Sequence, residues 1–323
     1  MTQTQSRPAP PEVNPGRRFV GVALAVLSGV ALAAQSRING ELSVRLDDAF
    51  AAALISFGSG LLVLAVCVPL LPKGRDGLRR LRFGLRTRQI HPWQCIGGMC
   101  GGFLVATQGL TVPTVGVAVF IVALVAGQSS SSLLVDRAGI GPGGPQPVTR
   151  MRLAGAALTV LAVLISVSDR LGHPSALALA ILPLLAGIGI AWQQAVNGQV
   201  RVVSGSAMVA GLVNFFMGTV VLAVAFAMSA LLRGVPARLP TGPWWLYVGG
   251  TLGIVFIAVG AAVVRHTGVL LLGLGMIAGQ VTGALLLDTV VPGAAGRPGA
   301  TTVVGAVLTL AAVAVAVAPT RRQ

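Results

Sequence analysis

The chain has 323 residues, of which 54% are hydrophobic and only 10% are charged, and its formal net charge is +15. Soluble domains carry about 25% charged residues, so this composition excludes soluble enzymes and disordered proteins and indicates a membrane protein. The basic excess is then expected to report membrane orientation, and no nucleic-acid partner is expected.

Ten apolar runs approach the length of about 20 residues that a helix needs to cross the hydrocarbon core. A polar, Pro-rich tail at residues 1–18 precedes them, and a short tail at 319–323 follows. Residues 89–135 hold no formal charge and are too long for one span, so Pro113 is predicted to divide them. The expected spans lie near 19–40, 49–71, 93–112, 114–135, 152–168, 176–200, 206–232, 244–264, 267–287 and 302–318.

The first apolar run has an alternative interpretation. Arg17 and Arg18 precede it, and residues 31–33 read Ala-Leu-Ala, which resembles a signal-peptidase site. A cleaved signal peptide therefore competes with a first membrane span. A related segment recurs later in the chain, which favours the span.

The basic residues are distributed unevenly over the predicted loops. With a cytoplasmic amino terminus, seventeen of the 23 lie on the inside and six on the outside, which satisfies the positive-inside rule. Both termini are therefore predicted to be cytoplasmic. The 72–92 loop alone contains seven: Lys73, Arg75, Arg79, Arg80, Arg82, Arg86 and Arg88. We interpret this cluster as an orientation signal, with contact to anionic lipid headgroups as the alternative.

The chain contains an internal repeat of about 150 residues. Three motifs occur twice in the same order: Q-x-x-x-N-G at 35–40 and 193–198, Pro-Trp at 92–93 and 243–244, and Ala-Gly-Gln with a later Asp at 126–136 and 278–288. The predicted units are residues 19–170 and 171–318. Each holds five spans, and because five is odd the second unit must enter the membrane in the opposite sense. Inverted repeats of this kind are typical of secondary transporters.

These paired motifs resemble the YdcZ-like family of bacterial inner-membrane exporters, within the drug/metabolite transporter superfamily. The resemblance covers residues 19–318 as two tandem units. It implies an all-α, EamA-like membrane protein with ten transmembrane helices in two inverted five-helix repeats. It also implies a location in the bacterial inner membrane and a central cavity, but no particular substrate.

Carboxamide side chains recur inside the predicted spans. Because an unpaired polar group is costly in hydrocarbon, such amides face a partner or a water-filled cavity. Residues i and i+4 share a helix face, so each Q-x-x-x-N-G motif presents two amides together. The candidate substrate-binding residues are Gln35, Asn39, Gln128, Gln193, Asn197 and Gln280. Hydrogen bonding between helices is the competing interpretation.

Other polar residues receive structural interpretations. Ser56 and Asn214 are repeat-equivalent and are expected to bond within the protein, and Ser129 to Ser132 could extend a polar lining. Asp136 and Asp288 lie at equivalent helix ends. Solvated helix termini are the favoured interpretation for these two acids, and gate-forming pairs with arginines such as Arg137 are the alternative. No acid is predicted near the middle of a span, which argues against proton antiport.

No catalytic motif, metal-ligand spacing or cofactor motif emerges, so we expect no enzyme and no cofactor. The sequence predicts a secondary-active exporter that moves a small polar or amphipathic solute by alternating access. Its expected partners are the solute and the lipid bilayer, and the oligomeric state is left open. A non-transporting membrane scaffold and an intramembrane lipid-handling enzyme are the alternatives.

Overall fold

A computed structural model describes residues 15–168, 174–234 and 242–317, with the side chains of 15–18, 174–177, 260–271 and 317 left out. Within these ranges the chain is helical and forms no β-strand, which confirms the all-α class. The predicted tails fall largely outside the described residues. The first helix begins at Pro15, inside the segment predicted as a tail.

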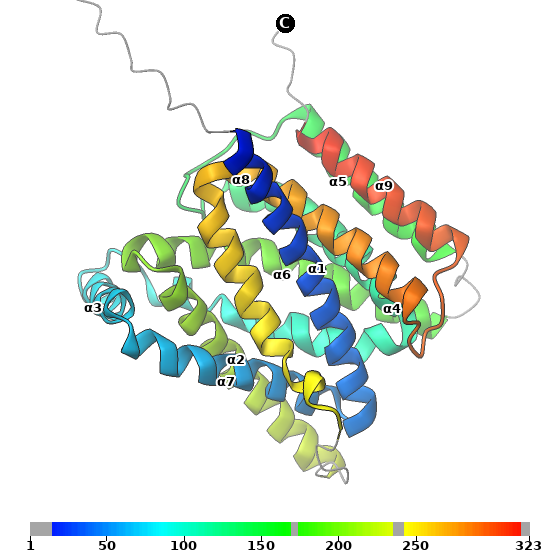
Figure 1. Cartoon of the computed structure of the whole chain (residues 1–323), viewed down its shortest axis with the longest axis horizontal. Coiled ribbons are helices and arrows are strands. Elements are labelled where there is room, and N and C mark those ends of the chain that lie inside the picture. Colours follow the sequence, from blue (N-terminus) through cyan, green and yellow to red (C-terminus); the bar gives the residue numbers. More distant parts are fainter. Residues whose placement is uncertain (1–14, 169–173, 235–241, 318–323) are drawn as a thin grey trace, which may run out of the picture.

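Long helices make up most of the described chain (Figure 1). In chain order the elements are α1 (Pro15–Leu46), α2 (Ala49–Leu70), α3 (Pro72–Arg86), η1 (Pro92–Cys95), α4 (Gly98–Arg137), α5 (Arg150–Ser166), α6 (Pro174–Ser204), α7 (Ala207–Arg233), η3 (Trp244–Tyr247), α8 (Gly249–Val290) and α9 (Ala300–Val317).

Six segments of the described chain are helical, long and apolar enough to cross a membrane. They are Phe19–Leu46, Ala49–Leu70, Pro92–Arg137, Ala178–Ser204, Ala207–Arg233 and Leu272–Val290. Large apolar side chains such as Leu231 and Leu232 on α7 point away from the protein. An apolar outer surface marks contact with lipid or protein, and with six membrane-length segments the fold is that of a multi-pass membrane protein.

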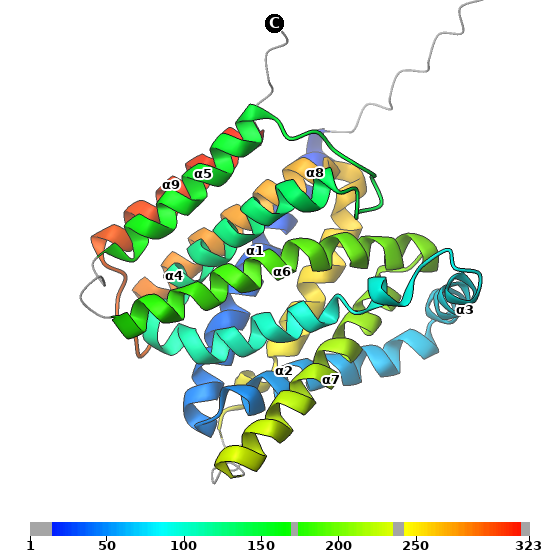
Figure 2. The ribbon, with the colours of Figure 1, turned by 180° about the vertical axis from the view of Figure 1, so that it is seen from behind.

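The helix α4 is broken near its middle, close to the predicted break at Pro113. The backbone leaves helical geometry at Gly116, where φ is 84° and ψ is 163°, a conformation that glycine adopts without strain. Pro113 cannot donate to the carbonyl of Gly109, and the Ser43 hydroxyl on α1 donates to that oxygen instead, over 2.9 Å. Figure 2 shows the two halves of α4 running in different directions.

The helix α8 covers the region in which two spans are predicted, at 244–264 and 267–287. It is one run of helix from Gly249 to Val290, and Figure 1 shows that it changes direction between its yellow and orange halves. Unlike α4, this segment contains no proline that would mark the change of direction in the sequence.

Helices from the two halves of the chain pack against each other. The most extensive contacts join α1 to α8, α4 to α6, α5 to α9, and α2 to α7, and α5 and α9 lie side by side in both views (Figures 1 and 2). If the halves are exchanged, the α1–α8 contact corresponds to the α6–α4 contact. Each half therefore completes the packing of the other.

Glycines allow these helices to approach closely. A Cβ placed on Gly127 of α4 would lie 2.0 Å from the carbonyl oxygen of Leu184 on α6. At the equivalent position on α8, a Cβ on Gly279 would lie 1.9 Å from the carbonyl oxygen of Val26 on α1. Since backbone cannot move as a side chain can, these crossings require glycine.

The segment 72–92, expected to be a loop, contains the helix α3. Gly74, Gly77, Leu81 and Gly84 are buried on one side of it. These positions follow the helical period, and Leu78, Leu81 and Leu85 lie on the same side, so the segment has the pattern of an amphipathic helix.

We expect Gly127→Ala to destabilise the protein by about 1–3 kcal/mol, because the added methyl group overlaps the backbone of α6. The matched control is Gly58→Ala in α2, where a Cβ meets nothing within 4 Å and alanine improves helix propensity by about 0.5–1 kcal/mol. Thermal unfolding in detergent compares the two variants. Equal stability of the two would show that the α4–α6 crossing is not as close as described.

Candidate substrate cavity

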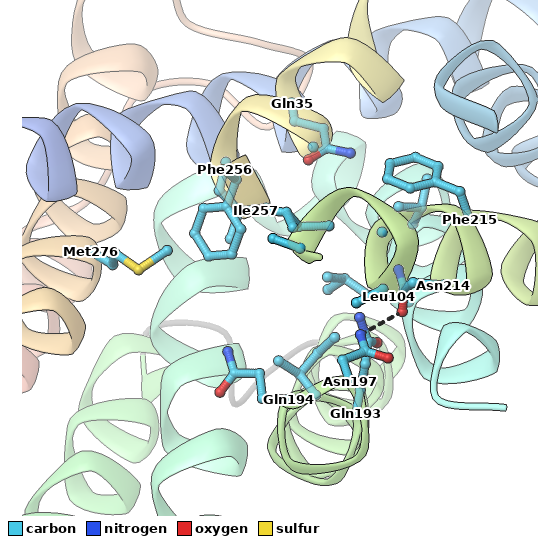
Figure 3. Close-up of a pocket in the computed structure, with 18 of the residues that line it drawn as sticks. Gln35, Leu104, Gln193, Gln194, Asn197, Asn214, Phe215, Phe256, Ile257 and Met276 are labelled. Atoms are coloured by element: carbon cyan, nitrogen blue, oxygen red, sulfur yellow. Dashed lines mark hydrogen bonds between the residues drawn. The ribbon is translucent and has the colours of Figure 1, made fainter. Parts of the chain in front are cut away.

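A cavity of about 400 Å³ lies among α1, α2, α4, α6, α7 and α8. Its wall combines apolar side chains, such as Phe57, Phe215 and Met276, with carboxamides (Figure 3). The amide residues on the wall are Gln35, Gln128, Gln193, Gln194, Asn197, Asn214 and Gln280. This mixture is typical of small-molecule sites, where a few polar groups orient a largely apolar ligand.

Two glutamines occupy equivalent positions, one in each half of the chain. Gln35 lies over Gly253, where a Cβ would come within 3.2 Å of Nε2, and Gln193 lies over Gly101, where a Cβ would come within 3.1 Å of Oε1. The absence of a side chain on each glycine gives the neighbouring glutamine room to reach the cavity.

A pair of phenylalanines joins the two halves at the cavity wall. The rings of Phe57 on α2 and Phe215 on α7 are tilted by 36°, with centroids 4.8 Å apart. Each ring packs against a glycine of the other helix, Phe57 against Gly218 and Phe215 against Gly60. Aromatic pairs of this geometry contribute about 0.5–1.5 kcal/mol beyond their buried area, so the pair holds α2 and α7 together beside the cavity.

Two amide pairs bond across the wall. Asn197 Nδ2 donates to Asn214 Oδ1 over 2.9 Å, as Figure 3 shows, and Gln128 Nε2 donates to Gln194 Oε1 over 3.1 Å. Asn214 was expected to bond within the protein, and it does so while also lining the cavity. These bonds fix the orientation of both wall segments.

Several amide oxygens on the wall have no hydrogen-bond partner among the described residues. They belong to Gln35, Gln193, Asn197 and Gln280. A buried polar atom without a partner costs about 1–3 kcal/mol, so such atoms in a native structure point to water or a ligand. A carboxamide can also turn by 180° and present its NH2 group, so these groups suit either donors or acceptors on a ligand.

Asn39 is placed differently from the other candidates. It is fully buried outside the cavity wall, and its Nδ2 donates to Gln108 Oε1 over 2.6 Å. Gln108 in turn donates to the Ser36 hydroxyl over 2.9 Å. This α1–α4 network was not predicted, because the equivalent position in the second half is Gly260, and Gln108 therefore has no repeat counterpart.

The serines after Gln128 do not extend the polar wall. Ser131 donates to the carbonyl of Ile188 on α6, and Ser132 donates to the carbonyl of Ser129 within its own helix. Helical serines commonly satisfy themselves in this way. The cavity therefore depends on carboxamides for its polarity.

One charged residue, Arg201, is among the residues that line the cavity. It lies in the last turn of α6 and is exposed, so the cavity reaches the surface near the α6–α7 turn. None of the described lining residues is acidic.

The far end of the bundle contains a buried carboxylate. Asp288, near the end of α8, is only 3% exposed, and its Oδ2 accepts from the backbone N–H of Ala118 over 2.8 Å. That N–H begins the second half of α4, just after the break at Gly116. An acid at a helix N-terminus is stabilised by the helix dipole, so Asp288 caps the broken helix.

Arg37 of α1 contacts the end of α8 at which Asp288 lies. Its guanidinium lies 4.0 Å from Asp288 Oδ1 and donates to the carbonyl of Val291 over 2.8 Å. The favoured interpretation of Asp288 as a solvated helix terminus is therefore wrong, because the broken α4 brings unsatisfied backbone N–H groups to it. Asp136 is exposed to a greater extent and pairs with Arg152 of α5 rather than with its neighbour Arg137.

The comparison with known families supports the sequence resemblance. A family model described as "Putative inner membrane exporter, YdcZ" matches residues 20–165 and 178–315. The two matches cover the two halves that the repeat defines. No curated protein is significantly similar to the chain.

We expect Gln108→Leu to lower the free energy of unfolding by about 1–3 kcal/mol, because it leaves the amide of Asn39 buried without its acceptor. Since neither residue lines the cavity, binding of a cavity ligand should be unchanged. Thermal unfolding and ligand titration of the same purified variant test both statements. Unchanged stability, or weakened ligand binding in a folded variant, would contradict this placement.

Proposed function

Because the chain belongs to the YdcZ family of inner-membrane exporters, within the drug/metabolite transporters, we propose that it is a secondary-active transporter that exports a small amphipathic solute by alternating access. The family is one of transporters and not an enzyme class. The observation that carries the proposal is the cavity between the two halves, with its unpartnered amide oxygens.

The proposed architecture is ten spans in two inverted repeats, with both termini in the cytoplasm. Two observations support the repeats: the helix pairings correspond when the halves are exchanged, and so do the close contacts at Gly127 and Gly279. The excess of basic residues in the predicted inside loops supports the orientation.

In this orientation the cavity is open toward the cytoplasm. Its lining includes Arg201 and Ala207, which flank the α6–α7 turn on the inside. The outer end is closed by the Asp288–Ala118 hydrogen bond and by Arg37. We assign this arrangement to the inward-facing state of the transport cycle.

In the outward-facing state the outer end of the cavity would be open and the inner end closed. The Asp288 cap would break, and α4 and α8 would move apart at the outer end. Asp136, the repeat equivalent of Asp288, is held in this state by Arg152 of α5. Release from Arg152 would free Asp136 to contact α8 at the inner end. The two acids thus form a pair of alternating caps, one for each gate.

The side chains that line the cavity indicate the class of solute that it binds. Aromatic and aliphatic side chains suit an apolar portion, and the amides suit a polar group that both donates and accepts. With Arg201 at the opening and no acid among the described lining residues, a neutral or anionic headgroup fits better than a cation. A thermal-shift screen of purified protein against neutral, anionic and cationic amphiphiles tests this order.

We expect Gln193→Leu and Gln35→Leu to weaken solute binding and transport by about tenfold or more, the equivalent of about 1.4 kcal/mol. Because each glutamine has a buried oxygen without a described partner, leucine should preserve or raise thermal stability. Transport assays in proteoliposomes and unfolding curves give the two quantities. The matched control is Gln89→Leu, at an exposed site outside the cavity. Full transport in both cavity variants would exclude these residues from the site.

We expect Asp288→Ala to open the outer gate, because loss of a charged hydrogen bond costs about 1.5–3 kcal/mol and so shifts the gate equilibrium at least tenfold. The reporter is Ala118→Cys in a background without Cys67, Cys95 and Cys100. Its labelling by an impermeant maleimide from outside should accelerate by that factor.

Asp48→Ala is the matched control for this gate experiment. Asp48 also caps a helix, but its carboxylate accepts from the N–H of Ala51 in α2, whereas that of Asp288 accepts from α4. It should leave the labelling rate of the reporter unchanged. If Asp288→Ala labels no faster than Asp48→Ala, Asp288 is not the outer gate.

A further inference from the structure

The helix α3 lies apart from the long helices of the bundle. It follows α2 directly, separated by Leu71 alone, and both views show it nearly end-on while the neighbouring helices run across the picture (Figures 1 and 2). An axis that crosses the spans and starts where an apolar span ends is that of a helix lying along the membrane surface.

One face of α3 is clamped to the protein. A Cβ on Gly74 would lie 2.0 Å from the carbonyl oxygen of Val68, at the end of α2. Cβ atoms on Gly77 and Gly84 would lie 2.9 Å from Val209 of α7 and 2.5 Å from Val203 of α6. The glycines thus hold α3 against α2 and against the α6–α7 turn in a fixed orientation.

The opposite face carries a stripe of arginines. They stand at positions i, i+4, i+7 and i+11, which share one side of a helix: Arg75, Arg79, Arg82 and Arg86. All four are exposed, and Asp76, paired with Arg79, is the one acid in α3. Because the contacts at Gly74, Gly77 and Gly84 fix the orientation of α3, the four arginines form a row that faces away from the protein.

Apolar side chains adjoin this row. Phe83 is 60% exposed on α3, and Leu70 and Leu71, at the junction with α2, are exposed as well. An aromatic ring beside arginines and above an apolar span matches the boundary between headgroups and acyl chains. A soluble anion or a nucleic acid would match the charges but leave this apolar surface in water.

We propose that the arginine row of α3 binds the phosphate groups of anionic phospholipids in the adjacent leaflet, with Phe83 inserted among the acyl chains. Arginine forms paired hydrogen bonds with phosphate oxygens, and each basic residue near an anionic surface adds to the attraction. Binding requires only the geometry of α3, so it does not depend on the transport function.

The position of α3 links this lipid site to the cavity. Gly77 of α3 packs against Ser206 and Val209, beside the α6–α7 turn. Ala207 and Ala210, in the same region, line the cavity. Bound lipid therefore stabilises the inner opening in the arrangement described here. This consequence, unlike lipid binding itself, rests on the proposed transport function.

The test measures the affinity of the full-length protein for phosphatidylglycerol, by native mass spectrometry or thermal shift in mixed micelles with phosphatidylcholine as the neutral lipid. Arg75→Gln with Arg82→Gln should weaken phosphatidylglycerol binding about thirtyfold. Arg75→Lys with Arg82→Lys keeps the charge but loses the paired hydrogen bonds, so it should weaken binding less than the glutamine pair does.

The matched control removes two exposed arginines from the other end of the protein, Arg233→Gln with Arg297→Gln, and should bind the lipid as the wild type does. Equal losses in both glutamine pairs would overturn the proposal, since they would indicate a general charge effect. Displacement of the lipid by millimolar inorganic phosphate would also overturn it, by identifying a soluble-anion site. Normal lipid binding by a protein that transports no solute would count against the proposed function and not against the lipid site.

Discussion

The close approach of helix backbones at glycine is the constraint on which the rest of this structure depends. Gly127 against Leu184 and Gly279 against Val26 bring α4 to α6 and α8 to α1, so each half of the chain packs mainly against the other. Apolar burial drives helix association weakly in lipid, and close packing takes its place. The cavity lies between these crossed pairs and is lined by residues of both.

Backbone satisfaction explains the polar residues outside the cavity. In a membrane each interruption of a helix must find a partner within the protein. Ser43 replaces the bond lost at Pro113, and Asp288 replaces the one lost at Gly116. The same bonds tie α1 and α8 to the broken α4, so the cost of interrupting a span is offset by contacts that can close a gate. Four of the buried amide oxygens without a described partner lie together on the cavity wall, on Gln35, Gln193, Asn197 and Gln280.

Site residues that belong to a repeated motif could be predicted from the sequence, whereas interactions that occur in one half of the chain only could not. Gln35 and Gln193 were identified because their motif recurs, and both line the cavity. The same motif placed Asn39 in the site, yet it bonds to Gln108, a residue without a repeat counterpart. The burial of Asp288 could not be predicted, because it depends on a break in a helix 170 positions away in the sequence. The helix α3 was missed although its leucines and arginines alternate with the helical period, because its basic residues were interpreted only as an orientation signal in a loop.

The central claim is that one cavity between the two halves opens to one side of the membrane at a time. The most direct measurement is the rate at which an impermeant thiol reagent modifies Ala210→Cys, on the cavity wall, from each side of oriented vesicles in a cysteine-free background. Without solute we expect rapid modification from the cytoplasmic side and slow modification from outside, and solute should change the ratio of the two rates. Equal, rapid modification from both sides would indicate a continuous channel, and no modification from either side would indicate a closed core. Either result would contradict alternating access.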